Sequence, residues 1–337
     1  MLRILWCVWL VGSVTAVVAA EVSHERWGIP VRWSQRGDAP SKQIVILGQR
    51  LFFDPGLSAS GHTACATCHD PQFAYGDPQR ISLLDSGGPG IRNAPPLINV
   101  RFRPRLMWDG RFRSLEEQAF SPFRRDGEMG ISIEDAAGRI SLDPSYSAQF
   151  FYVFRRPPWP HGIVEALAAW ERTLVAGSSR FDRYFYYRDQ LALSRWEQWG
   201  FEIFTRRANC AGCHVISIPG IPAPPLFSDF KFRNTGVGFT ELGYVDSGLS
   251  AVTSSKRDCG SFRTPSLRDI AVTGPYMHDG SFRTLDDVVA FYNAGGQPNP
   301  NLDPIVKPLG LSAQEGAALV AFLYSLSDAQ YQPYQTQ

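Results

Sequence analysis

Two short runs of this chain have the same pattern: two cysteines separated by two residues and followed directly by a histidine. The runs are Cys65-Ala66-Thr67-Cys68-His69 and Cys210-Ala211-Gly212-Cys213-His214. Two thiols at this spacing can form thioether bonds with the two vinyl groups of one haem, and the adjacent histidine then coordinates the iron. Two redox-active or zinc-binding cysteine pairs are the alternative, but the chain has no further cysteine–histidine pair to complete a zinc site. The pattern therefore predicts two covalently bound haem c groups.

The N-terminal residues 1–20 have the pattern of a secretory signal peptide. Arg3 gives a positively charged start, residues 4–18 are apolar, and Val18-Ala19-Ala20 forms a small-residue cleavage site before Glu21. An uncleaved membrane anchor is the alternative, although the apolar run is short for a transmembrane helix. Since covalent haem attachment takes place outside the cytoplasm, we expect a periplasmic protein that is secreted through this signal peptide.

Length and charge limit the classes of partner and the number of domains. The 337 residues have a formal net charge of +1, which argues against nucleic acid or an anionic membrane as the main partner. Each half of the chain carries one haem motif, so we expect two domains of ordinary size. The predicted N-terminal haem domain covers residues 21–190 and the C-terminal haem domain covers residues 191–337, with the boundary near residues 184–194.

Helical patterns recur along the chain, whereas strand patterns are scarce. Apolar spacing predicts helices over residues 42–52, 114–122, 163–174, 194–204, 285–294 and 312–326. The last of these begins at Ser312, and Glu315 completes a capping box with it. The 30 glycines and 25 prolines are concentrated between the helices and predict loops that wrap the cofactors. The predicted fold class is all-α and loop-rich, with few or no strands.

A helix of one pattern precedes each haem motif. Leu47-Gly48 with Leu51-Phe52-Phe53 comes before the first motif, and Gly200-Phe201 with Ile203-Phe204 comes before the second. A helix of this kind leading into a haem motif resembles class I cytochrome c domains. We therefore expect an internal duplication into two cytochrome c-like domains.

Between the two haem motifs lies a set of residues that a simple electron carrier does not need. The segments are Trp108-Asp109-Gly110-Arg111, Leu115-Glu116-Glu117-Gln118-Ala119 and Gly127-Glu128-Met129-Gly130. With these segments the chain resembles the bacterial di-haem cytochrome c peroxidases, the family that includes MauG, from about residue 47 to residue 326. The resemblance implies a peroxidatic N-terminal domain and an electron-transfer C-terminal domain. It also implies catalytic roles for Trp108, Gln118 and Glu128. These residues have the spacing of the family, in which a glutamine and a glutamate follow the tryptophan at ten and twenty residues.

The chemistry of these three side chains suits the roles that the resemblance implies. Cleavage of a peroxide needs a base that takes a proton from one oxygen and returns it to the leaving one, and Glu128 in a closed apolar pocket can do both. Gln118 can donate and accept hydrogen bonds to orient the peroxide. The indole of Trp108 can relay an oxidising equivalent between two irons that are too far apart for direct contact.

The resemblance also implies a calcium ion between the two domains. Asn93, Thr273 and Pro275 match the family's calcium ligands. One amide oxygen and two backbone carbonyls, completed by waters, suit a hard cation. An ordinary loop role for Asn93 is the alternative.

At the first haem this chain departs from the classical peroxidases. Those enzymes carry a histidine that caps the first iron until the second haem is reduced, and the matching residue here is Asp85. Residues 70–99 contain no histidine. We therefore expect the first haem to be held by His69 alone and to be open to peroxide without prior reduction, a feature that MauG shares.

The second haem needs a ligand opposite His214, and two residues compete for that role. The resemblance places the ligand at Tyr292, where classical members have methionine and MauG has tyrosine. Met277 is the alternative, since thioether ligation is common in cytochromes. Methionine raises the haem potential, whereas a phenolate lowers it and favours oxidised states. We interpret His278 as a structural residue or as a partner of a haem propionate.

Three functions follow from these expectations. The first is reduction of hydrogen peroxide with electrons from a small redox protein, either a cytochrome c or a copper protein. The second is a MauG-like oxidation of side chains in a partner protein, although the surface tryptophan that MauG uses is replaced here by Ala208. The third is a non-catalytic di-haem electron carrier. The resemblance also allows a homodimer, and the sequence does not identify the donor or the physiological role.

Overall fold

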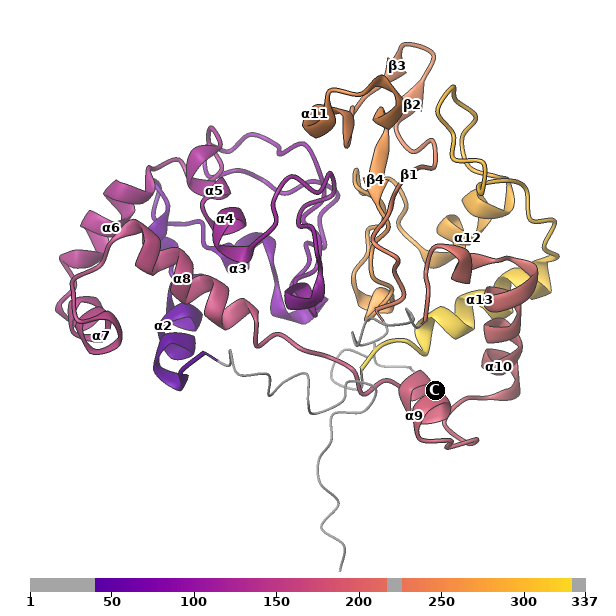
Figure 1. Cartoon of the computed structure of the whole chain (residues 1–337), viewed down its shortest axis with the longest axis horizontal. Coiled ribbons are helices and arrows are strands. Elements are labelled where there is room, and N and C mark those ends of the chain that lie inside the picture. The colour runs from indigo at the N-terminus through magenta and orange to yellow at the C-terminus, as the bar shows by residue number, and fades with distance from the viewer. Residues whose placement is uncertain (1–39, 217–225, 329–337) are drawn as a thin grey trace, which may run out of the picture.

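The protein folds into two mainly helical lobes that lie side by side (Figure 1). This computed structural model describes residues 40–216 and 226–328. The expected signal peptide, residues 1–20, lies outside the described residues. No helix in the described ranges is both long enough and apolar enough to cross a membrane.

The first lobe contains the helices that surround the first cysteine–histidine run. They are α2 (Lys42–Phe52), α3 (Cys65–Cys68), α4 (Leu115–Ala119), α5 (Ser121–Arg124), α6 (Ile133–Ser141), α7 (Pro144–Phe154) and α8 (Pro160–Glu171). Short 3-10 turns occupy Pro55–Leu57, Pro71–Phe73 and Val100–Phe102. The predicted helix over residues 114–122 is divided in two at Phe120, and Pro122 lies in the first turn of α5.

In the second lobe, helices likewise surround the second cysteine–histidine run. Its helices are α9 (Arg180–Tyr186), α10 (Arg195–Glu202), α11 (Ser250–Thr253), α12 (Leu285–Asn293) and α13 (Ala313–Tyr324). A π-helical turn, Ile203–Arg207, continues α10, and 3-10 turns occupy Cys210–Gly212, Lys256–Asp258 and Ile270–Val272. The capping box predicted for the last helix is present, because Ser312 and Glu315 bond reciprocally at the start of α13.

The described strands are few and short, which confirms the predicted fold class. They are β1 (Phe232–Asn234), β2 (Phe239–Thr240), β3 (Gly243–Tyr244) and β4 (Ser261–Arg263). They form two antiparallel pairs, β1 with β4 and β2 with β3. Phe232 pairs with Arg263 in the first of them.

Two equivalent helix pairs support the expected duplication. In the first lobe α2 crosses α8 so closely that a Cβ atom on Gly48 would lie 1.8 Å from the carbonyl oxygen of Ala166. In the second lobe α10 crosses α13 in the same way, and a Cβ on Gly200 would lie 1.9 Å from the carbonyl oxygen of Ala318. The glycine of each sequence repeat is therefore the point of helix contact, because only glycine lets two backbones approach this closely.

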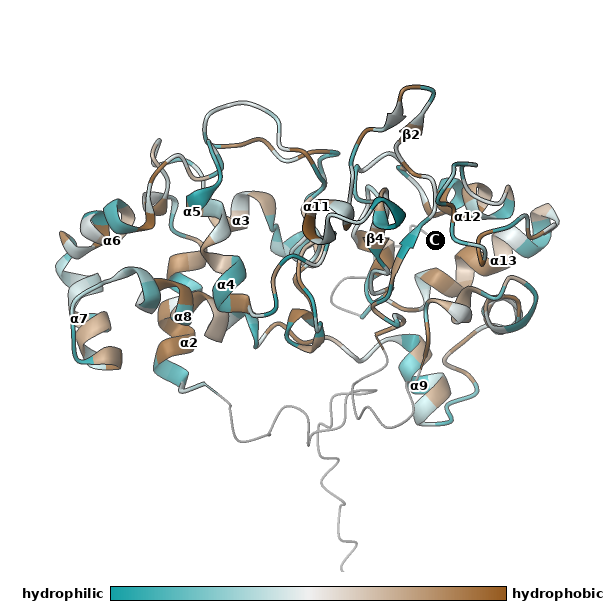
Figure 2. Cartoon of the chain, turned by 45° about the horizontal axis from the view of Figure 1, so that its top comes forward, coloured by the Kyte–Doolittle hydropathy of each residue, from teal (hydrophilic) through white to brown (hydrophobic). Residues whose placement is uncertain are grey.

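Each lobe has its own apolar core beside its cysteine–histidine run. Hydrophobic residues are concentrated on α2 and α8 in one lobe and on α13 in the other (Figure 2). Phe52 packs on Trp170 with ring centroids 4.2 Å apart, and Phe204 packs on Phe322 at 5.1 Å. Phe181 of α9 belongs to the second core. Helix α9 therefore packs with the second core although it precedes residue 191, and the domain boundary near residues 184–194 stays a prediction.

Hydrogen bonds and an ion pair connect the two lobes. The backbone N–H of Asn93 donates to the carbonyl of His278 at 2.8 Å, and the N–H of Arg263 donates to the carbonyl of Trp108 at 2.9 Å. Arg92 forms an ion pair with Asp246 of the second lobe at 2.6 Å. These contacts place Trp108 at the seam between the lobes.

Candidate active site

The first cysteine–histidine run lies on the wall of a cavity of about 670 Å³. Cys65 and Cys68 begin and end the single turn of α3, so their side chains lie on one face of it. The Nδ1 atom of His69 is 2.9 Å from the carbonyl oxygen of Tyr75, and burial lowers the pKa of the imidazole. A neutral ring that donates from Nδ1 leaves its Nε2 atom free to coordinate a metal. This donor set fits a covalently attached haem.

The second run lines a smaller cavity of about 220 Å³. The Nδ1 atom of His214 is 2.8 Å from the carbonyl oxygen of Phe227, so this ring is oriented in the same way as His69. Tyr292 of α12 and Met277 both line this cavity, together with Cys210 and Cys213. Burial raises the pKa of the Tyr292 phenol. The cavity thus fits a second haem and brings both candidate ligands to it.

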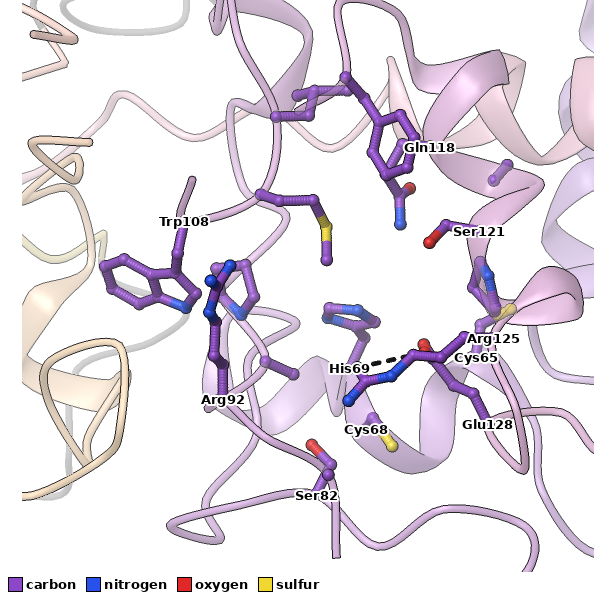
Figure 3. Close-up of a pocket in the computed structure, with 18 of the residues that line it drawn as sticks. Cys65, Cys68, His69, Ser82, Arg92, Trp108, Gln118, Ser121, Arg125 and Glu128 are labelled. Carbon is purple, nitrogen blue, oxygen red and sulfur yellow. Dashed lines mark ion pairs between the residues drawn. The ribbon is translucent and has the colours of Figure 1, made fainter. Parts of the chain in front are cut away.

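The predicted distal residues lie together on the wall of the first cavity. Gln118 comes from α4 and Glu128 from the turn after α5, and both line the cavity that holds His69 (Figure 3). A carboxylate oxygen of Glu128 is 3.5 Å from Arg125. Burial raises the pKa of Glu128, and the charges of Arg125 and Arg111 oppose this effect. The side chain of Glu128 is 32% exposed, and its surroundings are partly polar because Arg125 lies beside it.

The loop that contains Asp85 holds the backbone of Glu128 in place. The N–H of Asp85 donates to the carbonyl of Glu128 at 3.1 Å, and the N–H of Ser86 donates to that of Gly127 at 3.2 Å. The carboxylate of Asp85 accepts from the backbone N–H of Ser60 at 3.0 Å, and bonds to Ser60, Thr63 and Ser58 lower its pKa to about 2. Asp85 is therefore engaged by the opposite loop, and it does not belong to the cavity lining.

Trp108 and Asn93 line both cavities. The indole N–H of Trp108 donates to the carbonyl oxygen of Asn93 at 2.8 Å, and the tryptophan is only 9% exposed. Figure 3 shows Trp108 at the side of the first cavity that faces the second lobe. The indole is thus fixed between the two candidate haem sites.

The three candidate calcium ligands lie on the wall of the second cavity. Asn93 and Thr273 are buried, and Pro275 follows Thr273 closely in the chain. The side-chain nitrogen of Asn93 donates to the carbonyl of Gln79 at 2.9 Å. This bond fixes the amide so that its oxygen faces away from the Gln79 carbonyl. The structure thus brings the three residues to one region, and calcium binding there stays a prediction.

Several residues of the site were not found by sequence reasoning. Arg125 stands three residues before Glu128, and that charge spacing was a usable signal. Glu171 at the end of α8 lines the first cavity, is 6% exposed and has a carboxylate oxygen without a partner among the described residues. Burial raises the pKa of Glu171 to about 8. No sequence signal marks Glu171, because its burial depends on tertiary packing.

Comparisons with known proteins agree with this site. Residues 42–190 match the sequence profile of the di-haem cytochrome c peroxidase family. The chain is 36% identical over 285 residues to the methylamine utilization protein MauG of Methylorubrum extorquens, covering 84% of this chain and 77% of the relative. It is 37% identical over 316 residues to the cytochrome-c peroxidase IdrP1 of Denitromonas iodatirespirans, covering 84% of this chain and 81% of the relative.

Solved structures of similar fold are also di-haem peroxidases or MauG-like proteins. A MauG-like protein associated with microbial copper homeostasis superposes with a TM-score of 0.78 at 30% identity, covering 88% of this chain and 93% of that one. The diheme peroxidase BthA of Burkholderia thailandensis superposes with a TM-score of 0.74 at 28% identity, covering 88% and 89% of the two chains. This chain therefore belongs to the di-haem cytochrome c peroxidase family, a family of oxidoreductases that act on peroxide and carry two c-type haems.

Proposed function

We propose that this protein is a periplasmic peroxidase that reduces hydrogen peroxide in the first cavity and takes electrons, through Trp108 and the second haem site, from a small redox protein. Secretion would depend on the expected signal peptide in residues 1–20. The observation that carries the proposal is the meeting of Gln118 and Glu128 with His69 in one cavity, while Trp108 borders both cavities.

The side chains of the first cavity perform the proton chemistry of this proposal. When bound, the first haem supplies the iron at which peroxide is reduced, and His69 holds that iron through Nε2. The carboxylate of Glu128 takes a proton from one peroxide oxygen and returns it to the other, which leaves as water. The amide of Gln118 orients the peroxide. Two further protons and two electrons balance the conversion of one peroxide into two waters.

An open first haem is supported by the position of Asp85. Its carboxylate accepts a hydrogen bond from Ser60, and its loop is fixed to the backbone of Glu128, so it is held away from the cavity. We propose that His69 alone ligates the first iron, and that the oxidised protein reacts with peroxide without prior reduction. Tyr292 is the proposed distal ligand of the second iron, with Met277 as the alternative.

The proposal is tested by turnover of the oxidised holoprotein with hydrogen peroxide and reduced cytochrome c. We expect two equivalents of cytochrome c to be oxidised per peroxide, without a lag for reductive activation. A requirement for prior reduction would contradict the open first haem. Absence of reaction with peroxide, with both haems attached, would contradict the enzyme assignment and favour an electron carrier.

A MauG-like reaction is the second candidate, and it is favoured by the 36% identity to a protein of that name. In it the electrons come from side chains of a partner protein, so the product is a modified protein. Ala208, which stands where MauG has its surface tryptophan, is buried in the second core, so the same substrate and route are disfavoured. Rapid reaction with peroxide but no oxidation of any small redox protein would favour this candidate.

A further inference from the structure

Two arginines, one at each cavity, lack an acidic partner among the residues that the structure describes. Arg103 lines the first cavity and Arg263 lines the second. The Nε atom of each is buried and has no hydrogen-bond partner among the described residues. Arg103 donates from a terminal nitrogen to the carbonyl of Ile98 at 2.9 Å, and Arg263 donates to that of Thr264 at 3.2 Å. Neither side chain forms an ion pair within residues 40–216 and 226–328.

Two other arginines with little exposed area, Arg92 and Arg268, are paired with carboxylates. Arg92 bonds Asp109 and Asp246, and Arg268, which is 3% exposed, bonds the buried Asp182. Arg263 is equally buried at 3%, but within the described residues its side chain donates only to the carbonyl of Thr264. Burial of an unpaired charge is costly, so such groups are normally paired. The difference indicates that residues 40–216 and 226–328 do not supply the partners of Arg103 and Arg263.

Arg103 belongs to the first lobe and Arg263 to the second, on the two sides of the seam. Burial lowers the pKa of Arg103 to about 9, and the positive charge of Arg263 contributes to this shift. Burial lowers the pKa of Arg263 to about 10. The backbone N–H of Arg263 donates to the carbonyl of Trp108 at 2.9 Å. The backbone of Arg263 therefore contacts the tryptophan that borders the two cavities, and Arg103 lines the first cavity together with that tryptophan.

We propose that Arg103 and Arg263 are the counter-charges of haem propionates, each binding a propionate of the haem in its own cavity. A planar guanidinium with free N–H groups suits a carboxylate, which it can bind through two parallel hydrogen bonds. The pairing neutralises the two cations that would otherwise repel each other at the seam.

The pairing has a consequence for the haem potentials. A buried positive charge beside a haem favours the ferrous over the ferric state, because reduction removes one positive charge from the iron. Replacing Arg263 by methionine should therefore lower the potential of the second haem, and Arg103→Met should lower that of the first. A propionate that has lost its arginine also binds a proton more readily, so each potential should become more dependent on pH.

The experiment is a spectroelectrochemical titration of each haem in the holoprotein and in the two variants, repeated over a range of pH. We expect at least a tenfold change in the ferric–ferrous equilibrium of the adjacent haem, about 59 mV for one electron. The variants Arg103→Lys and Arg263→Lys keep the charge and should recover most of the shift. If a methionine variant does not fold with both haems attached, the lysine variant at the same position is measured in its place. Arg195→Met, at an exposed position of α10, is the matched control and should change neither potential.

The result that would overturn the inference is a pair of folded methionine variants whose potentials and pH slopes equal those of the parent protein. Potentials that fall equally in the lysine and methionine variants would also contradict it, because loss of packing rather than loss of charge would then explain the shift. The inference needs bound haem but not the proposed peroxide chemistry. These equilibrium potentials contain no peroxide step, so a failure of the proposed function leaves the test intact.

Discussion

Replacement of Glu128 by glutamine removes the proposed proton acceptor while keeping the shape of the side chain. The ion pair between Glu128 and Arg125 spans 3.5 Å, and the two side chains are 32% and 35% exposed. A pair of this exposure contributes only about 0–1 kcal/mol to stability, so we expect Glu128→Gln to fold and to bind both haems. Loss of a general base lowers a rate by about 10²–10⁴-fold. This corresponds to about 3–5 kcal/mol of activation free energy.

The pH dependence of the same reaction gives a second readout. Glu128 accepts a proton only as the carboxylate, so the rate should rise as the pH increases through its pKa. Burial raises that pKa, and the charge of Arg125 opposes the rise. Arg125→Met removes the opposing charge, so the acidic limb of the profile should move to higher pH. In Glu128→Gln this limb should disappear.

The assay is rapid mixing of the oxidised holoprotein with hydrogen peroxide, followed by haem absorbance at several pH values. Glu134→Gln, an exposed acid in the first turn of α6, is the matched control and should react as the parent protein does. If Glu128→Gln reacts within a few-fold of the parent protein and keeps the acidic limb, Glu128 is not the base.

Three further predictions follow from the same structure. Trp108→Phe loses the hydrogen bond to Asn93, but the variant should keep its fold and should exchange oxidising equivalents between the haems more slowly. If peroxide changes the absorbance of both haems as it does in the parent protein, Trp108 is not the relay. Gly48→Ala would place a Cβ 1.8 Å from the carbonyl of Ala166 and should lower the free energy of unfolding by about 1–3 kcal/mol. The Cβ atom of Gly138→Ala on α6 meets nothing within 4 Å, so this variant should raise the free energy of unfolding by about 0.5–1 kcal/mol. Thermal unfolding midpoints that move in the same direction in both variants would refute the packing argument. Chelation should abolish peroxide turnover and calcium should restore it, whereas full turnover by calcium-free protein would contradict the calcium site.

Where a local sequence signal defines a helix, the sequence was sufficient to predict that helix. The helix predicted over residues 42–52 is observed with those bounds, and Ser41 caps it by accepting from the N–H of Ile44. The helix predicted over residues 163–174 begins earlier, at Pro160, because proline is well placed in the first turn of a helix. The helix predicted over residues 194–204 ends at Glu202 and continues as a π-helical turn, which periodicity does not reveal.

The two longer helices of the first lobe that were not predicted, α6 and α7, each have a cap. Ser132 accepts from the N–H of Asp135 at the start of α6, and Asp143 caps α7 just before Pro144. Many residues of α7 are aromatic and several remain exposed, so its apolar pattern does not define a single buried face. The cap signals were therefore present, but the apolar periodicity of α7 was weak.

The candidate site divides in the same way. The attachment residues follow from spacing alone, because two cysteines and a histidine must be close in the chain to reach one haem. The meeting of Gln118 and Glu128 in one cavity depended on the resemblance to a family. The unpaired charges of Arg103 and Arg263 have no sequence signal, since a missing partner is visible only when tertiary contacts are known.

Low-temperature electron paramagnetic resonance of the fully oxidised holoprotein tests the central claim most directly. If His69 alone holds the first iron while His214 and Tyr292 or Met277 hold the second, the spectrum should contain one high-spin and one low-spin ferric signal. Two low-spin signals would mean that a second protein ligand caps the first iron, and that result would contradict the open peroxide site.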